Sequence, residues 1–114
     1  VNEFKPAFSI FGFRYAKVET DIPVENMELT SIAVYSDMEQ TGFFVCSDAD
    51  VNQLFHNALW NQKSNFVDVP TDCPTRERAG WTGAAQVYIP TALYLTDAYP
   101  VFRKWLSELR LVQF

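Results

Sequence analysis

The sequence is poor in the residues that bind metals and form disulfide bonds. Its only histidine is His56, and its two cysteines, Cys46 and Cys73, form neither a Cys-x-x-Cys pair nor a cluster with the histidine. Zinc sites need several such side chains at close spacing. We therefore expect no metal site and no cofactor, while two isolated thiols leave the disulfide state open.

Two further absences narrow the choice of partners. No apolar run approaches the roughly 18 residues that a membrane-spanning helix needs, so we expect no membrane partner. Basic side chains number 9 against 14 acidic ones, for a net charge of −5, and no basic stripe is present to bind phosphates. Nucleic acid is therefore not an expected partner either.

The chain has the composition of a globular protein, with 48% hydrophobic and 20% charged residues. Its 114 residues have room for one small domain or for parts of two neighbouring domains. The chain opens at Val1 without a signal peptide and stops at Phe114 within a helical pattern. We interpret both ends as boundaries of a piece of a longer protein, and its cellular location is left open.

Aromatic and β-branched residues dominate the first third of the chain. Residues 4–18 are rich in them, and residues 29–35 alternate between two faces with a period of two, which is typical of strands. Gly12 interrupts the first run and indicates a bulge or a close backbone contact. We therefore predict a β portion over residues 1–42, with the aromatic side chains from Phe8 to Tyr15 in its core.

From Ser47 onward, the apolar period becomes that of amphipathic helices. Helices are predicted over residues 48–64, 84–95 and 98–113. The expected N-caps are Ser47 or Asp48, then Thr82, then Asp97. Pro90 is expected to kink or interrupt the second helix, and Pro100 to lie in the first turn of the third. Residues 66–83 form a long loop, exposed at one end of the helices.

This loop carries the residues that suggest chemistry: Asp72, Arg76, Glu77, Arg78 and Trp81. Hydrolysis of a glycosidic bond needs one carboxylic acid to protonate the leaving oxygen and a second carboxylate to activate water or to attack directly. The arginines are expected to keep Asp72 ionised, while burial keeps Glu77 protonated. From the residue types alone, a set of solvated ion pairs is the competing interpretation.

Other reactive or aromatic residues have simpler interpretations. His56 lies between helix-face positions and is expected at the surface or an edge. Cys73 has no histidine partner in the loop, so a structural thiol is favoured over a nucleophile. Trp105 lies on the apolar stripe of the last helix and is expected in the core, whereas Trp60 fits either a core or a surface position.

Several strings in the sequence resemble glycoside hydrolase family 78, the bacterial α-L-rhamnosidases. The loop matches that family's signature through Asp72-Cys73-Pro74-Thr75-Arg76, Glu77-Arg78, Gly80-Trp81-Thr82-Gly83 and Ala85-Gln86. Upstream matches are Phe11-Gly12-Phe13-Arg14-Tyr15, with Phe11 in place of histidine, then Ser36-Asp37, Thr41-Gly42-Phe43 and Cys46-Ser47-Asp48. The resemblance covers nearly the whole chain.

The resemblance implies a mixed fold made of two partial domains. Residues 1–42 would be the C-terminal part of a β-sandwich domain, and residues 43–114 the N-terminal part of an (α/α)6 catalytic barrel. The activity implied is that of an inverting glycosidase that removes terminal α-L-rhamnose from a rhamnose-containing glycoside or polysaccharide. Three helices cannot close such a barrel, so their apolar faces are expected to be covered by the rest of a longer chain or by self-association.

The resemblance also assigns roles to residues of the loop. Glu77 matches the general acid, Asp72 a carboxylate that binds rhamnose hydroxyls, and Trp81 an aromatic side chain of the sugar pocket. Arg76 is expected beside them as a further substrate-binding residue. The family's general base is a glutamate far downstream of this chain, so we expect the chain alone to be inactive.

One position departs from the family pattern. Where the family has Trp-Thr-Gly-Asp-Ala-Gln, this chain has Ala84 in place of a sugar-binding aspartate. This departure, together with the missing base, keeps an alternative open: a carbohydrate-binding or structural segment without catalytic activity. A third hypothesis is an interaction module whose apolar helix faces meet a partner chain.

Overall fold

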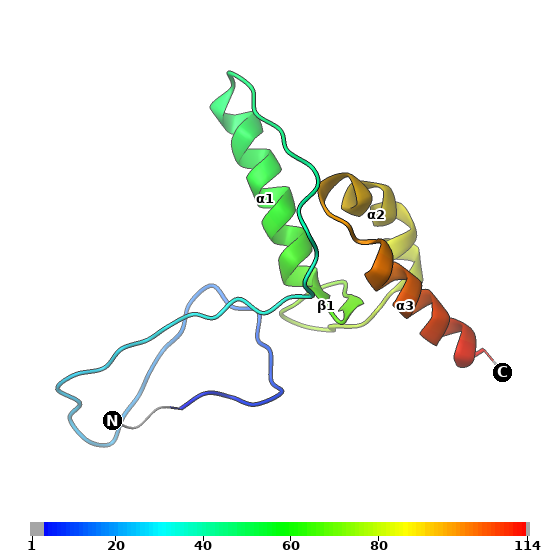
Figure 1. Ribbon diagram of the computed structural model, residues 1–114. Helices are drawn as coiled ribbons and strands as arrows, with labels where there is room; N and C mark the ends of the chain where they lie inside the picture. Colours follow the sequence, from blue (N-terminus) through cyan, green and yellow to red (C-terminus); the bar gives the residue numbers. More distant parts are fainter. Residues whose placement is uncertain (1–3, 114) are drawn as a thin grey trace.

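The computed structural model describes residues 4–113, in which three helices are joined through a short hairpin (Figure 1). The helices are α1 (Ala49–Asn65), α2 (Thr82–Leu95) and α3 (Tyr99–Leu111). The hairpin between α1 and α2 pairs β1 (Phe66–Val67) with β2 (Val69–Pro70) in antiparallel register. The three helices predicted from the apolar period are thus confirmed, with each end displaced by two residues at most.

Helix α1 begins with the side-chain cap that the sequence predicts. An oxygen of the Asp48 carboxylate accepts hydrogen bonds from the backbone N–H groups of Asp50 (2.9 Å) and Val51 (3.2 Å). These groups would otherwise have no partner inside the helix. Pro100 lies in the first turn of α3, as predicted, where a missing N–H breaks no helical hydrogen bond.

The other two predicted caps are wrong. Helix α2 includes Thr82 itself, and α3 begins after Ala98, so that Asp97 lies one residue too early to cap it. The backbone N–H of Asp97 instead donates to the carbonyl of Glu39 (2.8 Å), a partner remote in sequence. Helix α2 also runs through Pro90 without interruption.

The predicted β-sandwich strands are absent from the described part of residues 1–42. Residues 4–39 contain no strand, and the one β-bridge of this region joins Gln40 to Thr96; residues 1–3 lie outside the described residues. The side chains expected in a sandwich core, Phe8, Phe11, Phe13 and Tyr15, are exposed. A period of two is a local signal, whereas a strand forms only by pairing with a neighbouring strand, and residues 4–113 provide no such partner for this region.

Residues 4–35 instead form an open arm that extends away from the helices, at the lower left of Figure 1. The radius of gyration is 17.8 Å, well above the roughly 13 Å of a compact domain of this length. The arm therefore contributes little to the core, and the helical part holds the fold together.

The core lies where the hairpin meets α2 and α3, and Phe66 is at its centre. The Phe66 ring stacks edge-on against Phe102 of α3, with centroids 5.5 Å apart, and packs on Tyr88 of α2 at 6.1 Å. The buried apolar side chains of this cluster are Phe66, Ala85, Ala92, Ala98, Phe102 and Trp105. The prediction that Trp105 belongs to the core is confirmed.

The segment before α1 runs back along the helices (Figure 1). The backbone N–H groups of Thr41 and Gly42 both donate to the carbonyl of Leu95, at the end of α2 (3.1 and 3.0 Å). Further along, the Asn52 side chain exchanges two hydrogen bonds with the backbone of Cys46. This segment therefore ties the start of α1 to the end of α2.

Replacing Gly42 by alanine is expected to lower the free energy of unfolding by about 1–3 kcal/mol. A Cβ at this position would overlap the backbone carbonyl of Tyr94, which is held within α2 and cannot move freely. Gly83→Ala is the matched control, because a Cβ there meets open space, and alanine in a helix is favoured by up to about 1 kcal/mol. Urea unfolding measures both; equal midpoints for the two variants would contradict the close approach at Gly42.

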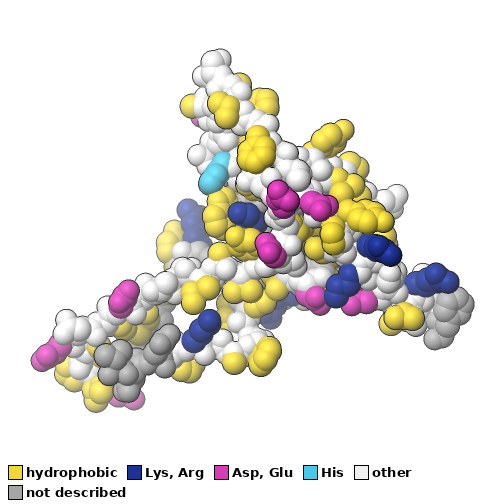
Figure 2. Space-filling view, viewed as in Figure 1, with side chains coloured by type: hydrophobic (Ala, Val, Ile, Leu, Met, Phe, Trp, Pro, Cys, Tyr) yellow, Lys and Arg dark blue, Asp and Glu magenta, His cyan; other side chains and the backbone are white. Residues whose placement is uncertain are grey.

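Large apolar side chains remain exposed on both the arm and the helices (Figure 2). On the helices they include Leu54, Val87, Leu93 and Leu106. Within residues 4–113, no helix combines the length and apolar character needed to cross a membrane. That the rest of a longer chain or a second copy covers these side chains stays a prediction.

Candidate active site

The loop between β2 and α2 folds back on itself and brings the predicted residues together. The backbone N–H of Asp72 donates to the carbonyl of Ala79 (3.1 Å), and that of Arg78 to the carbonyl of Cys73 (3.2 Å). These two bonds close the loop across Glu77. Arg78 has a φ of 52°, in the left-handed region, which turns the chain sharply after the glutamate.

Asp72 is half-buried at the base of the loop. One oxygen of its carboxylate accepts a hydrogen bond from the Ala79 N–H (3.1 Å), and the other accepts one from the Cys73 thiol (3.3 Å). Partial burial alone raises the pKa of the Asp72 carboxyl. Hydrogen bonds from the Cys73 thiol and from backbone N–H groups oppose this effect, and the pKa of the carboxyl lies well below its usual range. Asp72 is therefore a carboxylate at neutral pH.

Glu77 lies at the exposed tip of the loop. Its carboxyl Oε2 accepts a hydrogen bond from the indole N–H of Trp81 (2.8 Å), four residues along the chain. Its backbone N–H donates to the Cys73 sulfur (3.2 Å). The glutamate is thus accessible from solvent and yet held at both its side chain and its backbone.

The arginines are not where the sequence analysis expected them. Arg76 is exposed and makes no described hydrogen bond or ion pair with either carboxylate, and Arg78 donates to the backbone carbonyl of Ile10 (2.6 Å). The prediction that arginines keep Asp72 ionised is therefore wrong, because the thiol and backbone N–H groups take that place. The expected burial of Glu77 is wrong as well, since its side chain is exposed.

The competing interpretation, a set of solvated ion pairs, does not describe the loop either. The ion pairs among the described residues lie elsewhere, at Lys17–Glu19 on the arm and around Lys104 of α3. Trp81 is 58% exposed, and Ala84 is exposed in the first turn of α2. Three of the predicted residues, Asp72, Glu77 and Trp81, are thus brought together.

Cys73 is the residue that sequence reasoning undervalued. Its sulfur contacts both the Asp72 carboxylate and the Glu77 backbone, and so connects the two acidic residues. Both cysteines are free thiols. The only sequence signal for this role was the position of Cys73 between the two acidic residues. The atoms that the sulfur contacts depend on how the loop folds.

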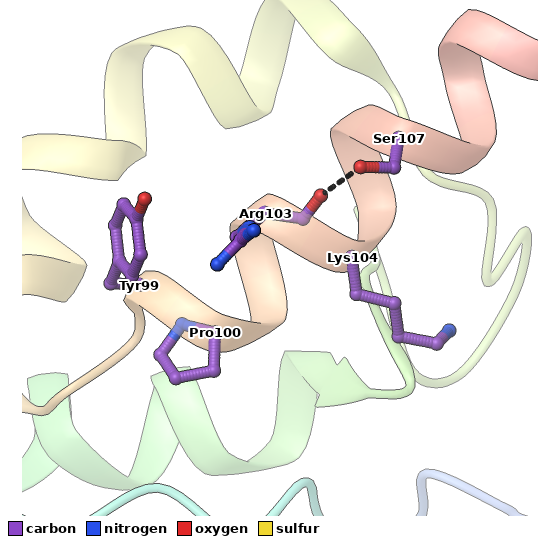
Figure 3. A pocket seen from close by; sticks show the side chains of 5 residues that line it. All are labelled: Tyr99, Pro100, Arg103, Lys104 and Ser107. Carbon is purple, nitrogen blue, oxygen red and sulfur yellow. Dashed lines mark hydrogen bonds between the residues drawn. The ribbon is translucent and has the colours of Figure 1, made fainter.

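Two surface depressions among the described residues lie away from the loop. One of about 350 Å³ is formed on α3 by Tyr99, Pro100, Arg103, Lys104 and Ser107 (Figure 3). Another of about 400 Å³ lies between α2 and α3 and is lined mainly by apolar side chains. Neither shares a residue with residues 72–81. His56, the one histidine, is exposed on α1, as predicted.

The chain is similar to several known proteins. An α-L-rhamnosidase from Formosa agariphila is 38% identical over 98% of this chain, and one from Alteromonas sp. is 36% identical over 96%. The chain spans only 12% of the length of each. Among solved structures, an α-L-rhamnosidase from Dictyoglumus thermophilum matches 70% of this chain and 9% of its own, with a TM-score of 0.66 and 38% identity.

Residues 39–113 match a glycosidase domain built from helical hairpins, and this match includes all three helices and the loop. The family model is described as the bacterial α-L-rhamnosidase six-hairpin glycosidase domain, and the chain belongs to this family. The match begins at residue 39, just before the point where the arm joins the helices.

Proposed function

We propose that this chain supplies the acid-bearing loop of an α-L-rhamnosidase, an enzyme that releases terminal α-L-rhamnose from glycosides. The observation that carries this proposal is the geometry of Glu77. Its carboxyl is exposed, oriented by the Trp81 indole, and lies next to the ionised, half-buried Asp72. The acid of a glycosidase must reach the glycosidic oxygen from a fixed position, and an accessible carboxyl held by a neighbouring donor meets that need.

Within this proposal, each residue has its own role. Glu77 donates its proton to the glycosidic oxygen as the bond to the sugar breaks. Each Asp72 oxygen has one described hydrogen bond from the protein and can accept another, from a sugar hydroxyl. The exposed Trp81 ring packs against the apolar face of the sugar, and the exposed Arg76 donates to hydroxyl groups.

The reaction needs a second carboxylate on the opposite face of the sugar to activate water. Within our proposal, this base comes from outside the chain, and the reaction inverts the anomeric centre. Residues 43–114 then form the N-terminal part of a catalytic domain of helical hairpins, and residues 1–42 belong to the region that precedes it. The exposed helix faces are covered by the remaining hairpins.

A carbohydrate-binding or structural segment without catalysis is the second candidate, and Ala84 favours it, because alanine cannot accept a hydrogen bond from a sugar. Turnover separates the two. The longer enzyme that contains this chain is expected to hydrolyse an aryl α-L-rhamnoside and to release β-L-rhamnose first, as followed by proton NMR of the anomeric signals. The 114-residue chain is expected to show no turnover. Binding of rhamnose by the longer protein without hydrolysis would favour the second candidate.

Replacing Ala84 by aspartate in the longer enzyme is expected to strengthen sugar binding. A carboxylate that accepts hydroxyl hydrogen bonds contributes about 1.5–3 kcal/mol, which corresponds to a fall in KM on the order of tenfold or more. Ala84 is exposed in the first turn of α2, where an acidic side chain is also compatible with the helix dipole. Steady-state kinetics measure the effect, with Ala84→Asn as control. An unchanged KM would remove position 84 from the sugar site.

A further inference from the structure

The arm, residues 4–35, contacts the loop between β2 and α2 through two hydrogen bonds. The Arg78 guanidinium donates to the carbonyl of Ile10 (2.6 Å), and the backbone N–H of Gly12 donates to the carbonyl of Pro74 (3.1 Å). Residues 10 and 78 are 68 positions apart in the sequence. On the loop, Pro74 and Arg78 lie on either side of Glu77, so the arm holds both flanks of the candidate acid.

Each contact depends on its residue type. A Cβ at position 12 would come within 2.8 Å of the Pro74 backbone and 2.9 Å of the Thr75 side chain, so only glycine allows this approach. Arg78 has a φ of 52°, a conformation that costs energy for any residue with a Cβ and persists only where the surroundings hold it. The bond to Ile10 is such a restraint.

Arg78 directly follows Glu77, so its backbone conformation sets the direction in which the glutamate leaves the loop. We propose that Arg78 is a positioning residue for catalysis, which clamps the loop to the arm and thereby holds the Glu77 carboxyl where the glycosidic oxygen must receive its proton. Arg78 itself touches neither the sugar nor the proton. This inference rests on the proposed function.

If Arg78 positions the acid, the loss of activity on replacing Arg78 is expected to depend on the leaving group of the substrate. Alkyl and sugar aglycones need a proton as the bond breaks, whereas nitrophenolate leaves readily without one. In the longer enzyme, Arg78→Asn is expected to lower kcat for an alkyl α-L-rhamnoside on the order of 10–100-fold. The loss on 4-nitrophenyl α-L-rhamnoside is expected to be clearly smaller, with little change in KM. Asparagine tolerates a positive φ, so this variant removes the guanidinium with little added backbone strain.

Two further variants complete the set. Arg78→Lys keeps a long, charged donor and is expected to recover part of the alkyl-rhamnoside activity. Arg110→Asn removes an exposed arginine from the last turn of α3 and is expected to leave both substrates unaffected. Equal losses by Arg78→Asn on the two substrates, or no loss on either, would overturn the clamp as a device for positioning the acid.

Hydrogen exchange tests the clamp without relying on activity. In the longer enzyme, Arg78→Asn is expected to speed exchange of the Arg78 and Ala79 amides, which bond within the loop to Cys73 and Asp72. If the wild-type enzyme hydrolyses no rhamnoside, the proposed function fails, and the exchange rates still decide whether Arg78 holds the loop. Rates in Arg78→Asn equal to wild type would reject the clamp.

Discussion

Glu77→Gln in the longer enzyme is expected to lower kcat for alkyl α-L-rhamnosides by about 10²–10⁴-fold, the usual contribution of a general acid. Glutamine has nearly the same shape, and its carbonyl oxygen can still accept the hydrogen bond from the Trp81 indole. The change therefore removes the transferable proton and little else. Steady-state kinetics with alkyl and nitrophenyl rhamnosides measure it, and the nitrophenyl substrate is expected to lose less.

Glu108→Gln is the matched control for this experiment. Glu108 is also an exposed glutamate, but it lies on α3 and pairs with Lys104 at 2.8 Å, away from the loop. Its replacement is expected to leave kcat unchanged, because an exposed ion pair contributes little to stability. A Glu77→Gln enzyme with kcat close to wild type would assign the acid to another residue.

Trp105→Ala is expected to lower the free energy of unfolding by about 3–5 kcal/mol. The Trp105 side chain is only 5% exposed within the core cluster, and its indole ring lies next to Gly80, in the loop between β2 and α2. Its loss leaves a cavity under both α3 and the loop. Folded domains have only about 5–15 kcal/mol of stability, so the expected loss is a large share of the free energy of unfolding. Urea unfolding followed by circular dichroism measures it.

Trp60→Ala is the comparison for this prediction. Trp60 has the same side chain but is 44% exposed on α1, where it contacts His56 and Lys63. Its replacement is expected to cost about 1 kcal/mol, typical of a partly exposed position. Equal losses for the two variants would mean that the buried cluster around Phe66 is not the main source of stability.

The site residues that could be predicted from the sequence are those that lie close together along the chain. Asp72, Glu77 and Trp81 lie within ten residues, and a loop of that length keeps its side chains within reach of one another. The partners of Asp72 were not predictable in the same way, because a thiol and a backbone N–H replaced the arginines that simple charge pairing suggests. How the loop closes determines those partners, and the closure involves the left-handed conformation at Arg78.

The sequence by itself determined the three helices, the Asp48 cap and the buried position of Trp105. An apolar stripe or a cap depends on residues within about four positions of each other, so it can be read without knowing the rest of the fold. Only the tertiary structure decided the conformation of residues 4–39. Their strand-like pattern forms no strand, because the described residues offer no neighbouring strand for pairing. The tertiary structure also determined the hydrogen bond between Arg78 and Ile10. Contacts between residues so far apart in sequence depend on the path of the whole chain.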